Sequence, residues 1–323
     1  MNEDLTQPVM SGLPIKRTFP SLGGKVTIQA GGDGAVAAVA GAERAIRDLH
    51  RRLTRFEADS ELSRLNADPR SEVPSSPIMV RFAEALRYAG ELSDGLVDAT
   101  LLGAIERAGY TESIDPDSAE SAPNETPLLS GVECRPGGKS ALSNWKRVTV
   151  DHATGCVGRP PGVKLDTGGL GKGLAADIGA ELLGHLEYFA VECSGDLRFG
   201  SQANQPRKII VASPLKGGDP VGELWLTGGA VATSGITRRS WVNRDGRPSH
   251  HLIDPRTGEP ARTGVTQVTA VAPTAVEGEV RAKAALLAGP DVASDWLVHG
   301  GIIVLDGGKT VSVGGLTKTE VLS

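Results

Sequence analysis

The sequence has few aromatic residues, few cysteines and no excess of positive charge. Aromatic residues make up only 4% of its 323 residues, which leaves few rings as platforms for stacking. Basic residues number 34 and acidic residues 39, so the formal net charge is −5 and we expect no nucleic acid as a partner. The three cysteines are widely spaced and odd in number, which excludes a disulfide framework or a zinc-ligand set and fits a reducing compartment.

Long hydrophobic runs are also absent. No stretch approaches the roughly 18 uninterrupted apolar residues of a membrane-spanning helix, so we expect no direct membrane insertion. Residues 1–20 lack the apolar core of an export signal, which predicts a cytoplasmic location. Hydrophobic residues at 39% and charged residues at 23% are near globular averages, so we expect a substantial core in one large domain or two intimate lobes.

The hydrophobic pattern predicts an α+β fold. Apolar residues recur at helical spacing from residue 35 to about residue 55, which is typical of an amphipathic helix. Because strands come in runs instead of alternating regularly with helices, we expect mixed, largely antiparallel sheets with packed helices. Further helices are expected at 77–92, 170–186, 275–287 and 292–298. Strands are expected at 25–29, 146–150, 163–166, 188–193, 208–212, 223–226, 230–233, around 252, 265–272, 302–305 and 310–313.

The composition changes between residues 111 and 144. This stretch is rich in Ser, Pro, Glu and Gly and has few large apolar side chains, which predicts a surface insertion. It separates two predicted lobes, of about residues 20–110 and 145–315, and residues 1–19 are expected to form an N-terminal arm.

A glycine-rich segment, Lys164-Leu-Asp-Thr-Gly-Gly-Leu-Gly-Lys-Gly173, predicts a strand, a tight turn and the start of a helix. Glycines let the backbone approach a ligand closely, and the free N–H groups at a helix N-terminus favour a phosphate. Lys172 adds a full positive charge. The spacing is not that of a Walker A loop, and an ordinary helix-entry turn without a ligand has the same pattern.

Two adjacent histidines lie downstream of the segment Val231-Ala-Thr-Ser-Gly235. Neighbouring residues of a strand point to opposite faces, so only one of His250 and His251 can serve a given pocket. His251 is the candidate base because several polar residues, Asp254 among them, follow it and because imidazole titrates near neutral pH. We expect His250 to form structural hydrogen bonds.

Two aspartates lie beside predicted elements. Asp196 follows a predicted strand in Glu192-Cys-Ser-Gly-Asp196, where it can bind a ligand hydroxyl or belong to an ordinary polar turn. Asp98 and Thr100, in Gly95-Leu-Val-Asp-Ala-Thr100, fit the capping of the next helix.

Taken together, these segments resemble the ApbE family, the FAD:protein FMN transferases. Six blocks follow the family's order and spacing and cover roughly residues 20–315, which implies one ApbE-like, two-lobed catalytic unit. The blocks are Thr54-Arg-Phe-Glu-Ala-Asp-Ser-Glu-Leu-Ser-Arg-Leu-Asn66, Gly95-Leu-Val-Asp-Ala-Thr100, Leu165-Asp-Thr-Gly-Gly-Leu-Gly-Lys-Gly173, Ser194-Gly-Asp196, Thr233-Ser-Gly235 and His251-Leu-Ile-Asp-Pro-Arg-Thr-Gly258.

The resemblance implies a reaction in which FAD is split at its pyrophosphate and FMN is esterified to a Ser or Thr of a target protein. The targets carry a motif like D-G-x-[ST]-G-A-T. A hydroxyl is a poor nucleophile, so a base must withdraw its proton, and His251 matches the family histidine. Lys172 and the glycine turn would face the charge on the phosphates. The residues implied to bind FAD are Asp98, Gly168, Gly169, Lys172, Asp196, Ser234, His251 and Asp254.

The chain departs from the family at the metal site. The family holds a divalent cation, usually magnesium, with a main-chain carbonyl of the glycine block and an Asp and a Thr in the pattern A-D-A-x-x-T. The corresponding residues here are Gly171, Glu279 and Lys283. The carbonyl of Gly171 and the carboxylate of Glu279 can ligate a cation, but the Lys283 ammonium has no lone pair and repels magnesium.

Three interpretations of this change stay open. Glu279 and Lys283 stand four residues apart in the order that favours a helical salt bridge. Alternatively, the Lys283 ammonium replaces the cation and touches the phosphates, or the metal is shifted onto Glu277 and Glu279. The sequence accordingly favours an FMN transferase. The alternatives are a non-catalytic FAD-binding protein and an FAD pyrophosphatase, which would use water in place of the target hydroxyl.

Overall fold

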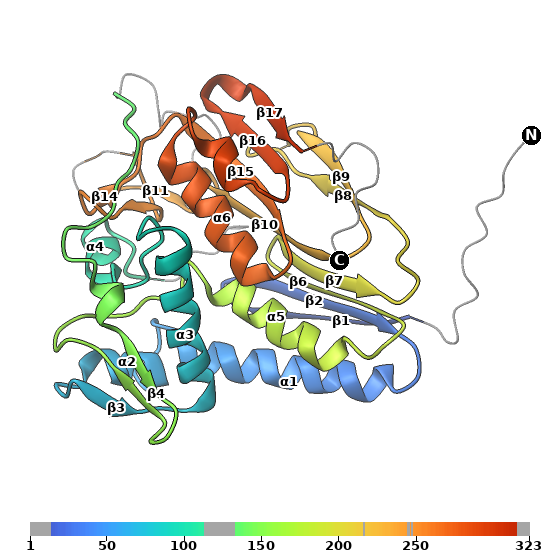
Figure 1. Cartoon of the computed structure of the whole chain (residues 1–323), viewed down its shortest axis with the longest axis horizontal. Coiled ribbons are helices and arrows are strands. Elements are labelled where there is room, and N and C mark those ends of the chain that lie inside the picture. Colours follow the sequence, from blue (N-terminus) through green and yellow to red (C-terminus); the bar gives the residue numbers. More distant parts are fainter. Residues whose placement is uncertain (1–13, 113–132, 216, 244–245, 247, 315–323) are drawn as a thin grey trace, which may run out of the picture.

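The computed structural model describes residues 14–112, 133–215, 217–243, 246 and 248–314. At its centre is an eight-stranded sheet with the strand order β1-β2-β6-β7-β10-β15-β16-β17, in which all neighbours pair antiparallel (Figure 1). This sheet confirms the predicted α+β fold. Its strands are β1 (Ile15–Ser21), β2 (Gly24–Gly31), β6 (Tyr188–Cys193), β7 (Asp196–Ser201), β10 (Gly229–Gly235), β15 (Val265–Ala272), β16 (Gly301–Leu305) and β17 (Thr310–Val313).

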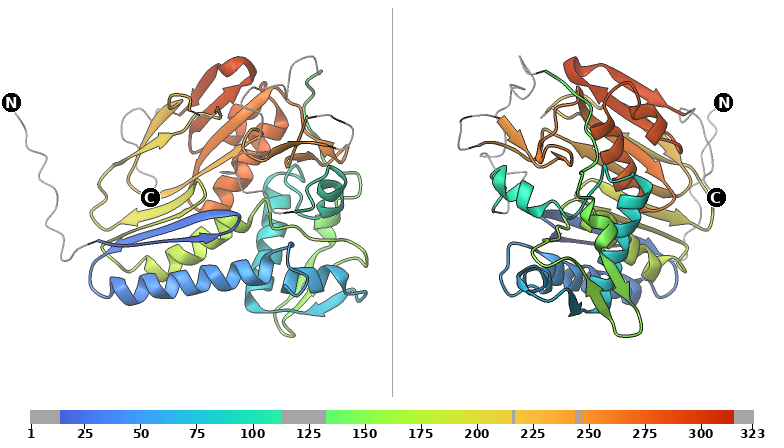
Figure 2. Two further views of the ribbon diagram at one scale, coloured as in Figure 1. Left: turned by 180° about the vertical axis from the view of Figure 1, so that it is seen from behind. Right: turned by 60° about the vertical axis from the view of Figure 1, so that its left-hand side comes forward.

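Three helices cover one face of this sheet: α1 (Ala35–Leu53), α5 (Gly171–Leu183) and α6 (Ala275–Ala288) (Figures 1 and 2). The apolar stripe predicted for the first of them is buried along its whole length, from Ala35 to Leu53. α5 lies between α1 and α6 on this face, and a Cβ on its Gly179 would lie only 3.1 Å from a methyl group of Val191. Small residues therefore allow α5 to pack closely against the strands.

The hairpin of β8 (Arg207–Val211) and β9 (Gly222–Leu226) covers part of the opposite face. Side chains from the hairpin and from the sheet form a separate apolar cluster there: Phe199, Val211, Leu224, Leu226, Val231, Val271 and Ile302. The sheet is therefore buried on both faces in this region, which explains why β15 is buried at every position.

A group of shorter elements lies beside one end of the sheet, on the left in Figure 1. It comprises α2 (Glu61–Ala67), α3 (Pro77–Leu92), α4 (Leu102–Arg107), η1 (Asn144–Arg147) and a three-stranded sheet of β3 (Glu72–Pro74), β5 (Cys156–Gly158) and β4 (Thr149–Asp151). The remaining elements are the pairs β11 (Ser240–Val242) with β12 (Pro248–His250) and β13 (Ile253–Asp254) with β14 (Glu259–Pro260), together with η2 (Ala293–Trp296) and η3 (Asp306–Gly308).

Some local predictions are wrong. Residues 163–166 form no strand, because the backbone N–H and C=O of Leu165 bond the side chain of Asn66 instead of a neighbouring strand. Residues 15–19 of the predicted arm belong to β1, which pairs with β2. Leu252 lies between β12 and β13, and the helix predicted at 292–298 is the short 3-10 turn η2.

Most of the predicted insertion, residues 113–132, lies outside the described residues, as do residues 1–13 of the arm. The division into two lobes stays a prediction. Within the part of the chain that the structure describes, every helix is too short or too polar to traverse a bilayer.

Candidate active site

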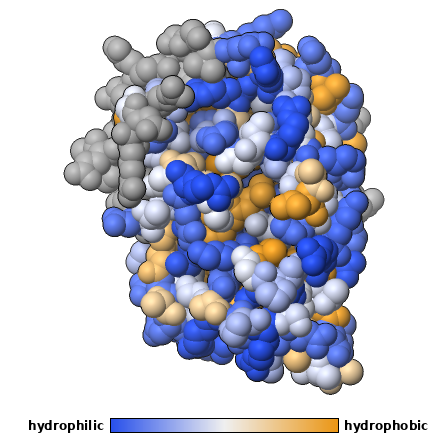
Figure 3. All heavy atoms as spheres, turned by 90° about the vertical axis from the view of Figure 1, so that its left-hand side faces the viewer, coloured by the Kyte–Doolittle hydropathy of each residue, from blue (hydrophilic) through white to orange (hydrophobic). Residues whose placement is uncertain are grey.

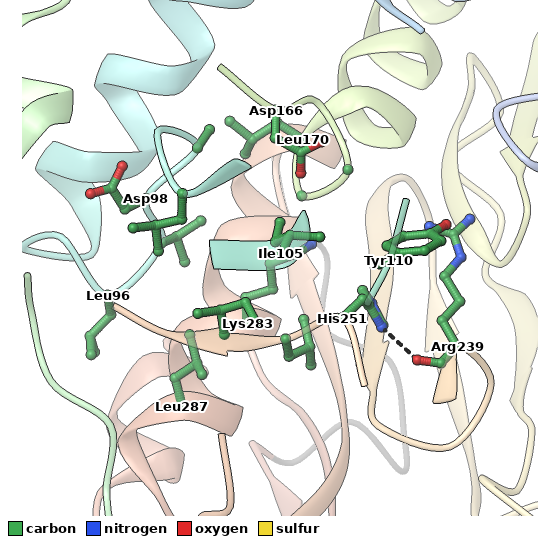
Figure 4. Close-up of a pocket in the computed structure, with 17 residues that line it drawn as sticks. Leu96, Asp98, Ile105, Tyr110, Asp166, Leu170, Arg239, His251, Lys283 and Leu287 are labelled. Carbon is green, nitrogen blue, oxygen red and sulfur yellow. Dashed lines mark hydrogen bonds between the residues drawn. The ribbon is translucent and has the colours of Figure 1, made fainter. Parts of the chain in front are cut away.

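A pocket lies between α4 with the segment before it, helix α6, and the chain that joins β12 to β13. It is lined by the segment before α4, the turn before α5, the chain after β12, and Lys283 and Leu287 of α6 (Figure 4). Figure 3 shows the side of the molecule that is on the left in Figure 1, where apolar side chains gather in a hollow and hydrophilic ones surround them. The pocket measures about 640 Å³ with its open mouth, of which about 70 Å³ is wide enough to hold water.

The glycine turn and His251 both line this pocket. A Cβ on Gly168 would lie 2.9 Å from Oδ2 of Asp166, and a Cβ on Gly169 would lie 3.3 Å from Cε of Lys283. Because neither glycine has a side chain, the carboxylate of Asp166 and the side chain of Lys283 can both approach this turn. Two segments that are far apart in the sequence thus meet at one cavity.

The two adjacent histidines have different surroundings. His251 lies 3.3 Å through Nδ1 from the backbone oxygen of Arg239 (Figure 4). A carbonyl only accepts hydrogen bonds, so Nδ1 carries the hydrogen and Nε2 keeps a lone pair. Burial, followed by the charges of Arg239 and other neighbours, lowers the pKa of His251 well below 6.5, and the imidazole is therefore neutral at pH 7.

His250 is fully buried and its Nε2 lies 2.8 Å from the backbone oxygen of Ala261. Burial lowers its pKa to about 4. His250 thus makes backbone hydrogen bonds, whereas its neighbour faces the pocket.

Two carboxylates line the pocket. Oδ1 of Asp98 accepts hydrogen bonds from the N–H of Thr100 at 2.8 Å and from its hydroxyl at 2.6 Å, while burial raises the pKa of Asp98. Asp166 pairs with Nε of Arg55 at 3.3 Å, and burial raises its pKa as well. The polar part of the pocket therefore combines two buried acids with a neutral imidazole.

Two lysines and two carboxylates form a largely buried cluster that reaches the pocket through Lys283 and that we call the charged cluster: Lys172, Asp196, Glu279 and Lys283. Lys172 donates to Oδ2 of Asp196 and lies 3.9 Å from Oε1 of Glu279. The same Oε1 lies 3.4 Å from Nζ of Lys283. Oε2 of Glu279 accepts from the N–H of Gly173 at 2.8 Å, which joins α6 to the first turn of α5.

The charged cluster has the wrong composition for a divalent cation. Both carboxylates are engaged by ammonium or N–H groups, and an ammonium has no lone pair to donate. Among the residues that the structure describes, no three His, Cys, Asp or Glu side chains come together as a metal site. Gly171 stands at the start of α5, directly before Lys172 of this cluster, and a Cβ there would meet only Thr167, at 3.5 Å.

Of the predicted FAD-binding residues, Asp98, Gly168, Gly169 and His251 line the pocket. Lys172 and Asp196 lie behind it in the charged cluster. Ser234 is buried within β10, and Asp254 accepts hydrogen bonds from the N–H groups of Gly138 at 2.9 Å and Arg256 at 3.0 Å. The structure thus places four of the eight predicted residues in the pocket lining and four, including Lys172 and Asp196, outside it.

Sequence reasoning missed three polar pocket residues: Tyr110, Asp166 and Arg239. Asp166 lies within the glycine block, and Arg239 lies four residues after the T-S-G block, so both had a positional signal. Tyr110 had none. It stacks on Trp241 with ring centroids 5.4 Å apart, and the guanidinium of Arg55 lies 4.6 Å from the centre of its ring.

Comparison with known proteins places the chain in a family. The family model described as "ApbE family" matches residues 22–305. The FAD:protein FMN transferase of Escherichia coli (strain K12) is 24% identical over 258 residues, which cover 78% of this chain and 71% of that protein. The FAD:protein FMN transferase of Vibrio cholerae is 27% identical over 234 residues, which cover 70% and 66%.

Solved structures of ApbE proteins have the same fold as this chain. The ApbE protein of Thermotoga maritima superposes with a TM-score of 0.72 at 25% identity, covering 93% of this chain and 97% of that one. The apo form of the Pseudomonas stutzeri flavinyl transferase ApbE shares the fold with a TM-score of 0.70 at 21% identity, covering 93% and 95%. Since the family model spans most of the sequence, the chain belongs to the ApbE family.

Proposed function

We propose that this protein is a FAD:protein FMN transferase, which cleaves FAD and attaches FMN through a phosphoester to a Thr or Ser of a target protein. The names of its relatives support this activity. The observation that carries the proposal is that the glycine turn, His251 and Lys283 line one pocket. A base and a cation thus face the same space as backbone groups suited to a phosphate.

In this proposal His251 is the general base. Its Nε2 lone pair takes the proton of the target hydroxyl, and the hydroxyl oxygen then attacks the phosphorus on the riboflavin side of FAD. The new bond joins that oxygen to phosphorus, and the P–O bond of the pyrophosphate breaks. AMP leaves with the electron pair of that bond, and the proton stays on His251 until solvent or product removes it.

Charge develops on the phosphoryl oxygens and on the departing AMP. Lys283 and Arg239 both line the pocket, and the charge of each lowers the pKa of His251. Fixed cations that face the developing charge stabilise the transition state without reorganising. We assign these two side chains and the N–H groups of the glycine turn to that role.

FAD does not fit the enclosed part of the pocket. The space open to water-sized groups is only about 70 Å³. FAD would therefore extend into the open mouth of the pocket, whose lining includes the apolar residues Leu96, Ile105 and Leu287 (Figure 4). We infer that the hollow in Figure 3 is the entrance.

The remaining assignments follow from the same proposal. The target protein would carry a motif like D-G-x-[ST]-G-A-T, and Asp98, Lys172, Asp196, Ser234 and Asp254 would bind FAD directly or support the groups that do. The single catalytic unit at 20–315 and the cytoplasmic location stay predictions.

The test is to incubate the purified protein with FAD and a target-domain protein and to look for covalent fluorescent flavin on a denaturing gel. We expect labelling of the target and release of AMP. Replacing His251 with Ala should slow labelling by roughly 100- to 10,000-fold, because the base is lost, while FAD still binds.

His299→Ala is the matched control, since His299 lies beside Glu277 and does not line the pocket. It should label at the wild-type rate. FAD binding without label or AMP release would instead identify a binding protein, and AMP with free FMN but no label would identify a pyrophosphatase. Undiminished labelling by His251→Ala would refute the role of the imidazole.

A further inference from the structure

In the charged cluster, Lys283 stands at the position where the ApbE family pattern has a threonine that binds the metal ion. We propose that the ammonium group of Lys283 receives the diphosphate of the dinucleotide, so that FAD binds to this protein without a divalent cation. The inference rests on the proposed function, since it takes FAD as the ligand, and it names the group that holds the phosphates.

The position of Lys283 is the first observation. The residue projects from α6 into the pocket lining, with 10% of its side chain exposed. Its Cε reaches the turn at Gly169, where a Cβ would lie 3.3 Å away. The ammonium group therefore stands beside the backbone that precedes α5, and Figure 4 shows Lys283 among the residues that line the pocket. An anion in the pocket would meet the lysine and the turn together.

The incomplete pairing of Lys283 is the second observation. Its carboxylate partner is Oε1 of Glu279, at 3.4 Å, whereas charge-assisted N–H···O bonds are usually about 2.7–2.9 Å long. The same oxygen is shared with Lys172 at 3.9 Å, and the other oxygen of Glu279 is occupied by the N–H of Gly173. Lys283 thus keeps hydrogen-bond donors for a ligand, since an ammonium group has three.

The sum of charges is the third observation. Two lysines and two carboxylates balance within the charged cluster, and the pocket lining holds the cations Lys283 and Arg239 together with the carboxyl groups of Asp98 and Asp166. Among the described residues, no ion-pair partner faces the Arg239 guanidinium; its contact is the backbone oxygen of Leu22 at 3.5 Å. Lys283 and Arg239 would attract a diphosphate in the pocket, whereas the two ammonium groups of the charged cluster would repel a divalent cation.

The experiment compares the binding of FAD and riboflavin, followed by flavin fluorescence, in EDTA and in excess magnesium. Wild-type protein should bind FAD equally under both conditions, within about twofold. Lys283→Met should weaken FAD binding by about tenfold or more, because it removes charged hydrogen bonds to phosphate, and leave riboflavin binding unchanged. Lys283→Arg should retain most of the FAD affinity.

Arg281→Met provides the matched control, because Arg281 is a similarly buried cation on the same helix, paired four residues away with Glu277 and outside the pocket lining. It should bind FAD as the wild type does. Equal weakening of FAD and riboflavin by Lys283→Met would show a structural role, and magnesium-dependent FAD binding by the wild type would show a metal site. Either result overturns the inference.

The double variant Glu279→Asp/Lys283→Thr restores the family pair and gives a second test. It should bind FAD weakly in EDTA and regain affinity with magnesium. An FAD affinity that does not change with magnesium would contradict the proposal that the Lys283 ammonium takes the place of the divalent cation. The outcomes separate the two proposals. Lysine-dependent FAD binding without labelling of a target refutes the transferase alone, whereas labelling that requires magnesium refutes only the role of Lys283.

Discussion

Helix α6 carries two glutamate–cation pairs with the same spacing and different surroundings. In the outer pair, Nε of Arg281 lies 2.7 Å from Oε1 of Glu277, and Arg281 also donates to the backbone oxygen of Trp296 at 3.3 Å. In the inner pair, Lys283 lies 3.4 Å from a carboxylate oxygen of Glu279 that it shares with Lys172.

The difference shows what spacing does and does not determine. A Glu placed four residues before a cation predicts an ion pair on a helix, and both pairs form. In the outer pair, Arg281 finds its hydrogen-bond partners on α6 itself and at the nearby Trp296. The inner pair belongs to a cluster that reaches α5, the sheet and the pocket, so its function depends on residues more than 80 positions away in the chain, such as Lys172 and Asp196.

The largest expected difference concerns stability. Glu279→Gln should lower the free energy of unfolding by about 3–5 kcal/mol, because two buried lysines lose their shared carboxylate. Glu277→Gln should cost less than about 2 kcal/mol, since a Gln oxygen still accepts hydrogen bonds there. Urea unfolding of the two variants measures both values, and equal losses would remove the distinction between the pairs.

A smaller effect is expected at the glycines that face the inner pair. A Cβ on Gly173 would lie 2.8 Å from Oε2 of Glu279 and from the backbone of Ala275, so Gly173→Ala should cost about 1–3 kcal/mol. A Cβ on Gly171 meets only ordinary contacts, and Gly171→Ala should change stability by less than about 1 kcal/mol. Thermal unfolding distinguishes them; a tolerated Gly173→Ala would mean that the contact between α5 and α6 is loose.

The smallest effect is a shift in pH dependence. His251 must be neutral to act as a base, and burial together with Arg239 and Lys283 lowers its pKa below 6.5. The neutral form therefore persists as the pH falls through 6.5, and kcat/KM for labelling should stay constant there and decline only at lower pH. Lys283→Met should move this decline towards higher pH, whereas Arg281→Met should not. A wild-type decline centred above pH 6.5 would contradict the assignment.

Long periodic segments could be predicted from the sequence, and short irregular ones could not. The stripe from Ala35 to Leu53 predicts α1 because one face of that helix packs against the core. The strands β3 and β5 have three residues each and carry too little pattern to be recognised, and the strand predicted at 146–150 overlaps β4 only at residues 149 and 150, since residues 146 and 147 belong to η1. Residues 163–166 have a strand-like composition, but the side chain of Asn66 satisfies the backbone of Leu165, which no local pattern reveals.

The candidate site shows the same division. Alternation predicts that only one of the two adjacent histidines serves the pocket, and the polar residues that follow favour His251, although β12 ends at His250. The glycine block is visible as a turn before a helix. Tyr110 reaches the pocket only through the tertiary fold, so neither spacing nor composition could identify it, whereas Arg239 stands close to a recognised block and could have been considered. The sequence likewise predicts the pair of Glu279 and Lys283, but Lys172 joins that pair only because α5 packs against α6.

A crystal structure of the protein grown with FAD and magnesium tests the central claim most directly. The diphosphate should lie between the glycine turn and His251, within hydrogen-bond distance of Nζ of Lys283, with no metal ion at Glu279. A metal ion held by Glu279 and the carbonyl of Gly171, or FAD bound outside this pocket, would contradict it.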